Sequence, residues 1–178
     1  MVVQTHVLRF LSWPAVSGDR ACAWPVLALQ LWAAGAILMA TLGAAVPAWA
    51  QSATVPLTLV TQSGKHVFQV EVMRTPDDLA RGLMFRRTMA KDRGMLFDFG
   101  KTQPVAMWMR NTYLPLDMVF IDRKGIIANI AENTEPLSEE NIVSVRPVLS
   151  VLEVNAGTAR RIGLRAGDKV LHPLFNKR

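Results

Sequence analysis

Short stretches of alternating apolar and polar residues run through the chain after residue 54. Residues 55–61 and 66–73 alternate in this way around Gln62-Ser63-Gly64-Lys65, which is typical of two strands joined by a turn. Further strands are expected at residues 94–99, 105–111, 116–122, 126–131, 148–154 and 169–172. About eight short strands at close spacing favour a single compact sandwich or barrel over a parallel α/β sheet.

Two short helices are expected at connections between these strands. Thr75 is suited to cap the first helix, Pro76 to occupy its first turn, and Gly82 to end it. Asn155 is expected to cap the second helix, which continues through Ile162 and stops at Gly163. The domain is therefore expected to be mainly β, with two small helices. The polar stretch 132–141 is expected to be an exposed loop.

The N-terminal part of the chain has a different pattern. Residues 25–46 are apolar apart from Gln30 and Thr41, and Pro47-Ala48-Trp49-Ala50 follows. Small residues in an Ala-x-Ala arrangement after an apolar run are typical of a secretory signal peptide. We expect residues 1–50 to form this peptide with cleavage after Ala50, residues 51–56 to be a flexible lead-in, and residues 57–175 to form the β domain. The alternative is an uncleaved N-terminal membrane anchor, because the apolar run is long enough to span a bilayer.

Composition narrows the classes of function. The only cysteine, Cys22, lies in the leader, so the exported domain is expected to have no disulfide and no thiolate metal site. His66 and His172 are isolated in the sequence, and neither a metal nor a cofactor is expected. The formal net charge is +6, but the basic residues are scattered, so a nucleic-acid partner is not expected. The domain is expected to be periplasmic or secreted, with membrane contact only through an uncleaved leader.

Polar residues interrupt the otherwise apolar segment 108–122. Buried strands avoid such groups unless each one finds a partner. The segment is expected to form a hairpin in which Asn111 lies near Asp117, while Trp108 and Arg110 share a face. In one interpretation Asp117 accepts hydrogen bonds from Asn111, Thr112 or backbone amides and holds the turn. In the other, an aromatic and amide pocket binds a sugar or a carboxylate.

Two arginines after the first helix extend this set. Arg81 and Arg86 are spaced to clamp a carboxylate or phosphate, to pair with Asp117, or to bridge to one of the acidic residues Asp77, Asp78, Asp92 and Asp98. The candidate ligand-binding residues are Arg81, Arg86, Trp108, Arg110, Asn111, Thr112 and Asp117.

Signals for catalysis are sparse. The sequence contains no Gly-x-Ser-x-Gly and no Ser-x-x-Lys motif. A carboxylate pair of Asp117 with Glu132 or Glu153 would suit glycoside chemistry. The methionines between residues 73 and 118, with Met107-x-Met109 among them, suggest either soft-metal binding through thioethers or core filling.

Several motifs together resemble the uncharacterised exported family DUF192. They are Arg81-Gly82-Leu83-Met84-Phe85-Arg86, Gly94-Met95-Leu96-Phe97, Trp108-Met109-Arg110-Asn111-Thr112, Pro115-Leu116-Asp117, Leu152-Glu153-Val154-Asn155-Ala156-Gly157 and Gly167-Asp168. The resemblance covers residues 57–171 and implies a compact, mainly β domain of jelly-roll type, often behind a signal peptide. It implies no reaction.

These observations lead to three hypotheses. The first is a non-enzymatic exported protein that binds a small polar or carbohydrate-like ligand, or a partner in the cell envelope. The second is a hydrolase that acts on envelope saccharides through paired carboxylates. The third is a purely structural or interaction module. A binding protein requires a cleft at Trp108, whereas a structural module requires Asn111 and Asp117 to be buried and satisfied by the protein itself.

Overall fold

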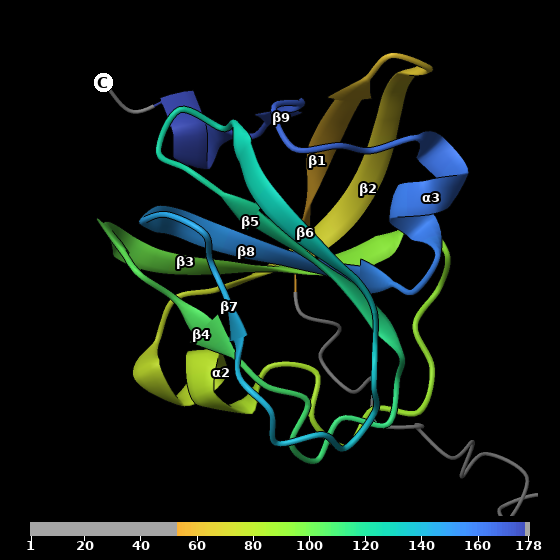
Figure 1. Cartoon of the computed structure of the whole chain (residues 1–178), viewed down its shortest axis with the longest axis vertical. Helices are drawn as coiled ribbons and strands as arrows, with labels where there is room; N and C mark the ends of the chain where they lie inside the picture. The colour runs from red at the N-terminus through yellow and green to blue at the C-terminus, as the bar shows by residue number, and fades with distance from the viewer. Residues whose placement is uncertain (1–52, 177–178) are drawn as a thin grey trace, which may run out of the picture. The chain divides into compact units, whose positions relative to one another are not determined.

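A computed structural model describes residues 53–176, which form a mainly β domain (Figure 1). Its strands are β1 (Thr54–Thr61), β2 (Gly64–Met73), β3 (Arg93–Gln103), β4 (Ala106–Met107), β5 (Leu116–Ile121), β6 (Ile127–Thr134), β7 (Ile142–Val143), β8 (Val148–Asn155) and β9 (Lys169–Leu171). The helices are α2 (Pro76–Arg81), α3 (Thr158–Ile162) and the 3-10 helix η2 (Pro173–Asn176). The predicted class, a mainly β domain with two short α-helices, is confirmed. The predicted signal peptide lies outside the described residues.

Seven of the strands form one curled sheet in the order β6-β5-β8-β3-β2-β1-β9. The pairs are antiparallel except for β2 and β3, which are parallel and are linked through α2 and the loop that follows it. The curl brings β9 to the start of β6, where Ile126 bridges to Lys169. There the Val170 N–H donates to the Gly125 carbonyl at 2.7 Å, and the Ile127 N–H donates to the Asp168 carbonyl at 3.0 Å. These bonds join the two edges of the sheet into a partly closed barrel.

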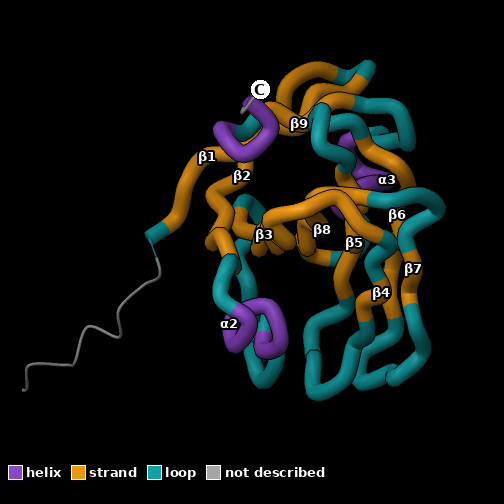
Figure 2. The backbone as a smooth tube through the Cα atoms, turned by 90° about the vertical axis from the view of Figure 1, so that its left-hand side faces the viewer, coloured by secondary structure: helices purple, strands orange, loops and turns teal. Residues whose placement is uncertain are grey.

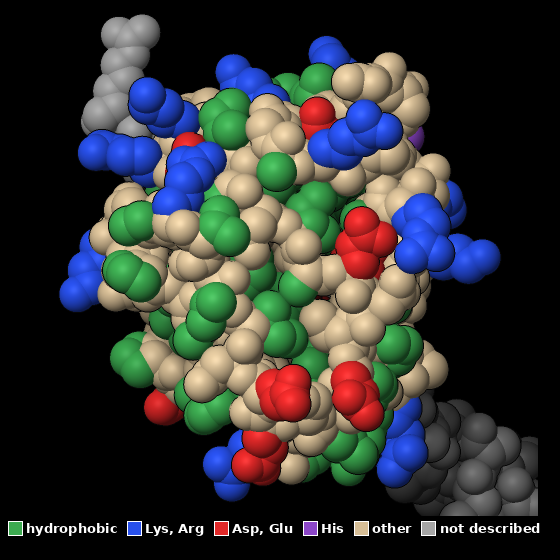
Figure 3. Space-filling model, in the orientation of Figure 1, with side chains coloured by type: hydrophobic (Ala, Val, Ile, Leu, Met, Phe, Trp, Pro, Cys, Tyr) green, Lys and Arg blue, Asp and Glu red, His purple; other side chains and the backbone are tan. Residues whose placement is uncertain are grey.

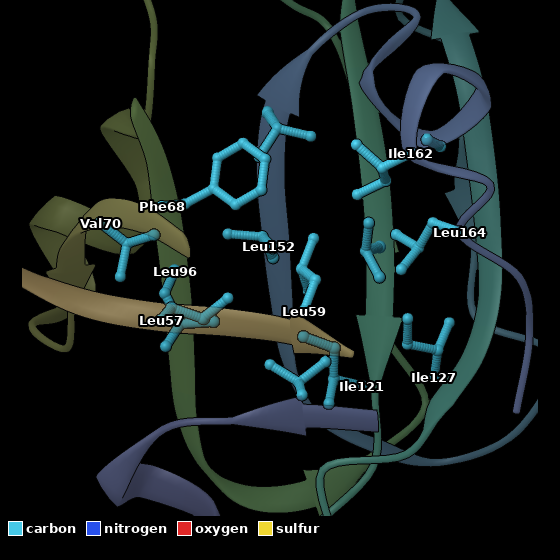
Figure 4. Close-up of a cluster of buried hydrophobic side chains, with 14 of the residues drawn as sticks. Leu57, Leu59, Phe68, Val70, Leu96, Ile121, Ile127, Leu152, Ile162 and Leu164 are labelled. Carbon is cyan, nitrogen blue, oxygen red and sulfur yellow. The ribbon is translucent and has the colours of Figure 1, made fainter. Parts of the chain in front are cut away.

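The inside of the curl holds one of two hydrophobic clusters, the inner cluster. It contains aliphatic and phenylalanine side chains from all seven strands, with Ala159 and Ile162 of α3. Figure 4 shows Leu57, Leu59, Leu96 and Leu152 pointing toward one another within it. On each strand these residues alternate with residues of the opposite face, as strand geometry requires.

The outer cluster lies on the other face of β3, β5 and β8. Its strand residues include Met95, Phe97, Met118 and Phe120, and loop residues such as Leu83 and Met109 cover them. The short strands β4 and β7 pair with each other beside this face. Figures 1 and 2 both place α2, β4 and β7 at one end of the domain, away from β9 and η2. Two sheet faces are therefore buried, one by the curl and one by loops.

The first predicted helix is confirmed with its caps. The Thr75 side chain accepts from the Asp78 N–H at 3.2 Å, Pro76 occupies the first turn, and Gly82 ends the helix. The cap predicted for the second helix is wrong. Asn155 ends β8, and its side-chain amide donates to the carbonyls of Met89 and Ala90. Gly157 is the N-cap residue of α3 instead, while Gly163 ends the helix as predicted.

The strand and hairpin predicted around residue 108 are also wrong. Only Ala106–Met107 is extended, and it pairs with β7 and not with β5. The backbone then turns, because the Met109 N–H donates to the Ser138 carbonyl and the Thr112 N–H donates to the Met109 carbonyl. Trp108 and Arg110 therefore lie in a loop and do not share a strand face.

Two boundaries also differ from the prediction. The lead-in was expected to reach residue 56, but β1 begins at Thr54 because residues 54–56 pair with Gln69–Glu71 of β2. The loop expected at 132–141 begins only after Thr134, because β6 continues that far along β5. Both corrections come from pairing with a neighbouring strand.

Candidate functional site

The structure divides the seven predicted site residues between two faces of the sheet. Asp117 lies on the inner face, on the same side as Val119 and Ile121. Arg110 points outward and pairs with the exposed Glu139 at 3.7 Å. The remaining five lie at the outer face, in or beside two adjoining hollows. These five are Arg81, Arg86, Trp108, Asn111 and Thr112.

Asp117 is a structural residue. It is fully buried, and its carboxylate accepts backbone N–H groups of Asn133 at 2.9 Å, Gly157 at 3.2 Å and Ala159 at 2.8 Å. The predicted bonding to backbone amides is therefore confirmed. The predicted partners Asn111, Thr112, Arg81 and Arg86 are wrong, because they lie at the opposite face. Asp117 of β5 thus binds the neighbouring strand β6 and attaches the start of α3 to the sheet.

The larger hollow is a cleft of about 350 Å³ between α2, the loop after it and the ends of β2 and β3. Glu71, Asp78, Arg81 and Arg86 supply its charged groups. The Arg86 guanidinium donates two hydrogen bonds, of 2.5 and 2.7 Å, to the Glu71 carboxylate. This hydrogen bonding raises the pKa of Arg86. Within the described residues the Arg81 guanidinium makes no hydrogen bond or ion pair, so it is available to a ligand.

The smaller hollow has a volume of about 30 Å³, which is enough for one water molecule. Arg81, Gly82 and Met84 line both hollows, so the two adjoin. Trp108 and the buried Thr112 also line the smaller one. Glu153 lines it from β8.

Glu153 is the titratable group that stands out in this region. It is 4% exposed, and desolvation by burial raises the pKa of its carboxyl to about 8. At neutral pH the group is therefore mainly protonated, and a protonated carboxyl can donate a hydrogen bond. Its register partners Met95 and Met118 place it on the outer face, opposite Asp117. Asp117 and Glu153, one of the two carboxylate pairs considered for glycoside chemistry, therefore do not meet.

Three loops are tied together around these hollows. The Phe85 N–H donates to the Asn111 carbonyl at 2.9 Å, and the Leu137 N–H donates to the Thr112 carbonyl at 3.1 Å. Phe85, Asn111 and Leu137 have positive φ angles of 64°, 55° and 65°. Asn tolerates such an angle better than most residues, whereas at Phe85 and Leu137 it costs of order 1–3 kcal/mol each. The loops hold this strain and leave Phe85 and Trp108 about half exposed, at 57% and 48%.

The ionic partners predicted for the arginines were wrong in detail. Arg86 pairs with Glu71, which was not among the predicted acidic residues. Glu71 carries no local signal in the sequence, because its position on β2 alternates like that of any strand residue. The sequence did indicate that Glu153 is unusual, since it is the one carboxyl in the mainly apolar segment 148–154. Its burial on the outer face depended on the strand register.

The described residues contain no group of three or more His, Cys, Asp or Glu side chains that could hold a metal ion. Among the same residues, no helix has the length and apolar character needed to cross a bilayer.

The structure defines this protein as a mainly β domain with a curled sheet and with two adjoining hollows beside α2. The DUF192 family model, described as "Uncharacterized ACR", matches residues 58–172. The chain belongs to the DUF192 family, as its motifs predicted.

Two solved structures are similar to this chain. One is a protein from Sinorhizobium meliloti 1021 that carries a provisional description as a transcription regulator. It is 52% identical, with a TM-score of 0.66 over 67% of this chain and 94% of that one. The other is a protein of unknown function from Novosphingobium aromaticivorans DSM 12444. It is 41% identical, with a TM-score of 0.66 over 67% of this chain and 85% of that one. Comparison with curated proteins finds no match.

Proposed function

We propose that this chain is an exported, non-enzymatic protein that binds a small polar or carbohydrate-like ligand at the cleft beside α2 and the smaller hollow that adjoins it. The observation that carries the proposal is the convergence of Arg81, Trp108, Thr112 and Glu153 on adjoining hollows. These residues come from three separate segments of the chain. Ligand sites typically combine apolar or aromatic walls with a few convergent polar groups.

Each of these groups has a distinct use in binding. Trp108 is about half exposed, and its ring offers an apolar face to a sugar ring or similar body. The guanidinium of Arg81 presents a planar set of donors suited to a carboxylate or to vicinal hydroxyls. Glu153, when protonated, donates to an acceptor that reaches into the smaller hollow. The ligand we expect is therefore rich in hydrogen-bond acceptors and has one apolar face.

Two observations favour binding over hydrolysis of saccharides. Hydrolysis by the usual mechanism needs two carboxyl groups flanking one bond. Asp117 is saturated by three backbone amides on the inner face, and Glu71 is held by Arg86. Glu153 is thus left without a second free carboxyl at the smaller hollow.

The description of the Sinorhizobium protein raises nucleic acid as a ligand, and the charge distribution here does not favour it. On the face drawn in Figure 3, lysine and arginine side chains are scattered around the rim and do not form one stripe. In the cleft, Glu71 and Asp78 offset Arg81 and Arg86. Nucleic-acid sites depend on concentrated positive charge.

Export is the part of the proposal that rests on the leader. N-terminal sequencing of the protein recovered from the periplasmic fraction is expected to begin at Gln51, after cleavage behind Ala50. Recovery of the intact chain in the membrane fraction would support the anchored alternative. Recovery of the intact chain in the cytoplasm would contradict export.

The ligand is tested with the exported protein and a panel of sugars, cell-wall fragments and small carboxylates. A ligand at 100 times its Kd should stabilise the fold by about 2.7 kcal/mol, which is visible as a rise in melting temperature. Trp108→Ala and Arg81→Ala are expected to abolish that rise. Arg110→Ala is the control, because Arg110 pairs with Glu139 outside the hollows and should leave the rise intact. The proposal fails if no compound raises the melting temperature, or if Trp108→Ala and Arg81→Ala both respond like the wild type.

A further inference from the structure

Methionine is distributed very unevenly between the two hydrophobic clusters. Among the described residues, the outer cluster contains or contacts Met73, Met89, Met95, Met107, Met109 and Met118, whereas no methionine lies in the inner cluster. Both clusters belong to one sheet and both bury leucine, valine and phenylalanine side chains. Methionine used only as an adaptable filler has no reason to avoid the inner cluster altogether. The uneven distribution therefore indicates that methionine has a specific role at the outer face and its cleft.

Three methionines converge on the larger cleft itself. Met73 and Met95 lie on the parallel strands β2 and β3, where Met95 is paired with Glu71 and Met73 with Phe97. Both therefore point to the outer face, two residues apart along the strands. Strands lie about 4.8 Å apart and rise about 3.3 Å per residue, so the two Cα atoms are roughly 8 Å apart. Two extended thioether side chains can close that gap.

The third methionine comes from the loop after α2. Met84 is half-buried and lines the same cleft as Met73 and Met95. The Asn111 side-chain nitrogen lies 4.0 Å from the Met84 sulfur, so the loop segment around Asn111 holds this side chain from the other side. Met95 is 1% exposed and forms part of the floor, while Met73 and Met84 are more accessible.

The ligand chemistry of this arrangement is that of a soft cation. Thioether sulfur is a soft donor that selects Cu(I), and it binds Mg²⁺ or Ca²⁺ poorly. Neither of the histidines in the described residues, His66 and His172, lines this cleft. Its charged groups, two acidic and two basic, balance, so a monovalent cation meets no net repulsion there.

We propose that Met73, Met84 and Met95 form a site for a soft monovalent cation of the Cu(I) and Ag(I) class. The site goes beyond the proposed polar ligand, because it uses the thioethers and not Arg81, Trp108 or Glu153. Met84 supplies its thioether from the 81–86 loop, and the other two methionines supply theirs from β2 and β3.

The test uses Ag(I) as a redox-stable probe in a nitrate buffer without chloride or thiols. Calorimetric titration of the exported protein is expected to show one strong site per chain. In a methyl correlation spectrum, the ε-methyl signals of Met73, Met84 and Met95 are expected to shift on saturation. Those of Met109 and Met118, which are fully buried away from the cleft, are expected to stay in place.

Methionine-to-leucine variants make a matched pair, because this exchange nearly conserves volume and usually costs less than about 1.5 kcal/mol per site. The variant Met73→Leu, Met84→Leu, Met95→Leu is expected to lose Ag(I) affinity by more than about 100-fold, since losing even an outer-shell partner costs about 10–100-fold. The control Met89→Leu, Met109→Leu, Met118→Leu removes three methionines of the same cluster and should keep wild-type affinity.

The outcomes separate cleanly. Circular dichroism and melting without metal establish that both triple variants are folded. Equal Ag(I) binding by the cleft variant and the control would overturn the proposal, as would the absence of binding to the wild type. A polar ligand found in the panel above should still stabilise the cleft variant if the thioethers serve only the cation. Failure of one proposal is thus distinguishable from failure of the other.

Discussion

Replacing Asp117 by Asn should destabilise the domain strongly although the two side chains have the same shape. The carboxylate is fully buried and accepts three backbone N–H groups, from Asn133, Gly157 and Ala159. An amide has one acceptor oxygen, and its NH₂ group must face at least one of these donors. In the less costly orientation the NH₂ group faces Ala159, whose N–H bonds to Oδ2 alone.

The magnitude follows from the three bonds. A hydrogen bond to a charged group contributes about 1.5–3 kcal/mol and a neutral one about 0.5–1.5 kcal/mol. Losing the bond from Ala159 and weakening the other two costs about 3–5 kcal/mol. Neutralising a buried charge recovers part of its desolvation penalty, so we expect a net loss of about 2–4 kcal/mol. For a domain with a total stability of about 5–15 kcal/mol, this is a large fraction.

Urea unfolding followed by circular dichroism measures this loss directly. Asp168→Asn is the matched control, because Asp168 accepts one backbone N–H, from Arg165, at an exposed position. The control should lose less than about 1 kcal/mol. A loss for Asp117→Asn within about 0.5 kcal/mol of the control would refute the assignment of Asp117 as the structural carboxylate.

Two other predictions concern Glu153 and the closure of the barrel. The folded pKa of Glu153 is about 8 and lies above the unfolded value, so its contribution is complete below about pH 4 and falls as pH rises toward 8. Glu153→Gln should remove this pH dependence. If urea unfolding shows that the free energy of unfolding changes equally between pH 5 and pH 8 in the variant and the wild type, the prediction is contradicted. Gly125 has a φ of 77°, and an added Cβ would lie 2.6 Å from the Val170 carbonyl oxygen. Gly125→Ala should therefore cost about 1–3 kcal/mol in the same assay, more than Gly163→Ala, where φ is also positive but nothing lies within 4 Å.

The two buried carboxyls show how the register of one strand pair assigns different roles. Asp117 pairs with Val154, and its neighbour Met118 pairs with Glu153. Side chains alternate between faces, so the two carboxyls point to opposite sides of the sheet. One accepts three backbone N–H groups, from β6 and from the start of α3. The other meets the outer cluster and the small hollow, where burial favours its protonated form.

Local structure was largely predictable. Alternation placed β1, β2, β5 and β6 within a few residues of their observed bounds, and Thr75 and Gly82 marked the ends of α2. Family membership could also be read from the motifs between Arg81 and Asp168. These features depend on residues close together in the chain, so a single sequence carries the information.

Predictions failed where a distant segment supplies the backbone hydrogen bonds. The apolar positions in residues 108–112 suit a strand. The segment is a loop, because its backbone forms hydrogen bonds with Ser138 and Leu137. Asn155 is a residue type that often caps helices, yet its side-chain amide donates hydrogen bonds to the carbonyls of Met89 and Ala90. The neighbouring residues of either segment do not indicate which distant residues are its hydrogen-bond partners.

The class of fold, the family and a set of polar candidate residues could all be predicted from residues close together in the chain. Which of those candidates meet depends on the tertiary structure. Asp117 lies on the opposite face from the site, and Arg86 pairs with Glu71. The adjoining hollows are lined by Arg81, Trp108 and Glu153. The physical reason is that strand register and sheet curl assign each side chain to a face, and both depend on pairing between segments far apart in the chain.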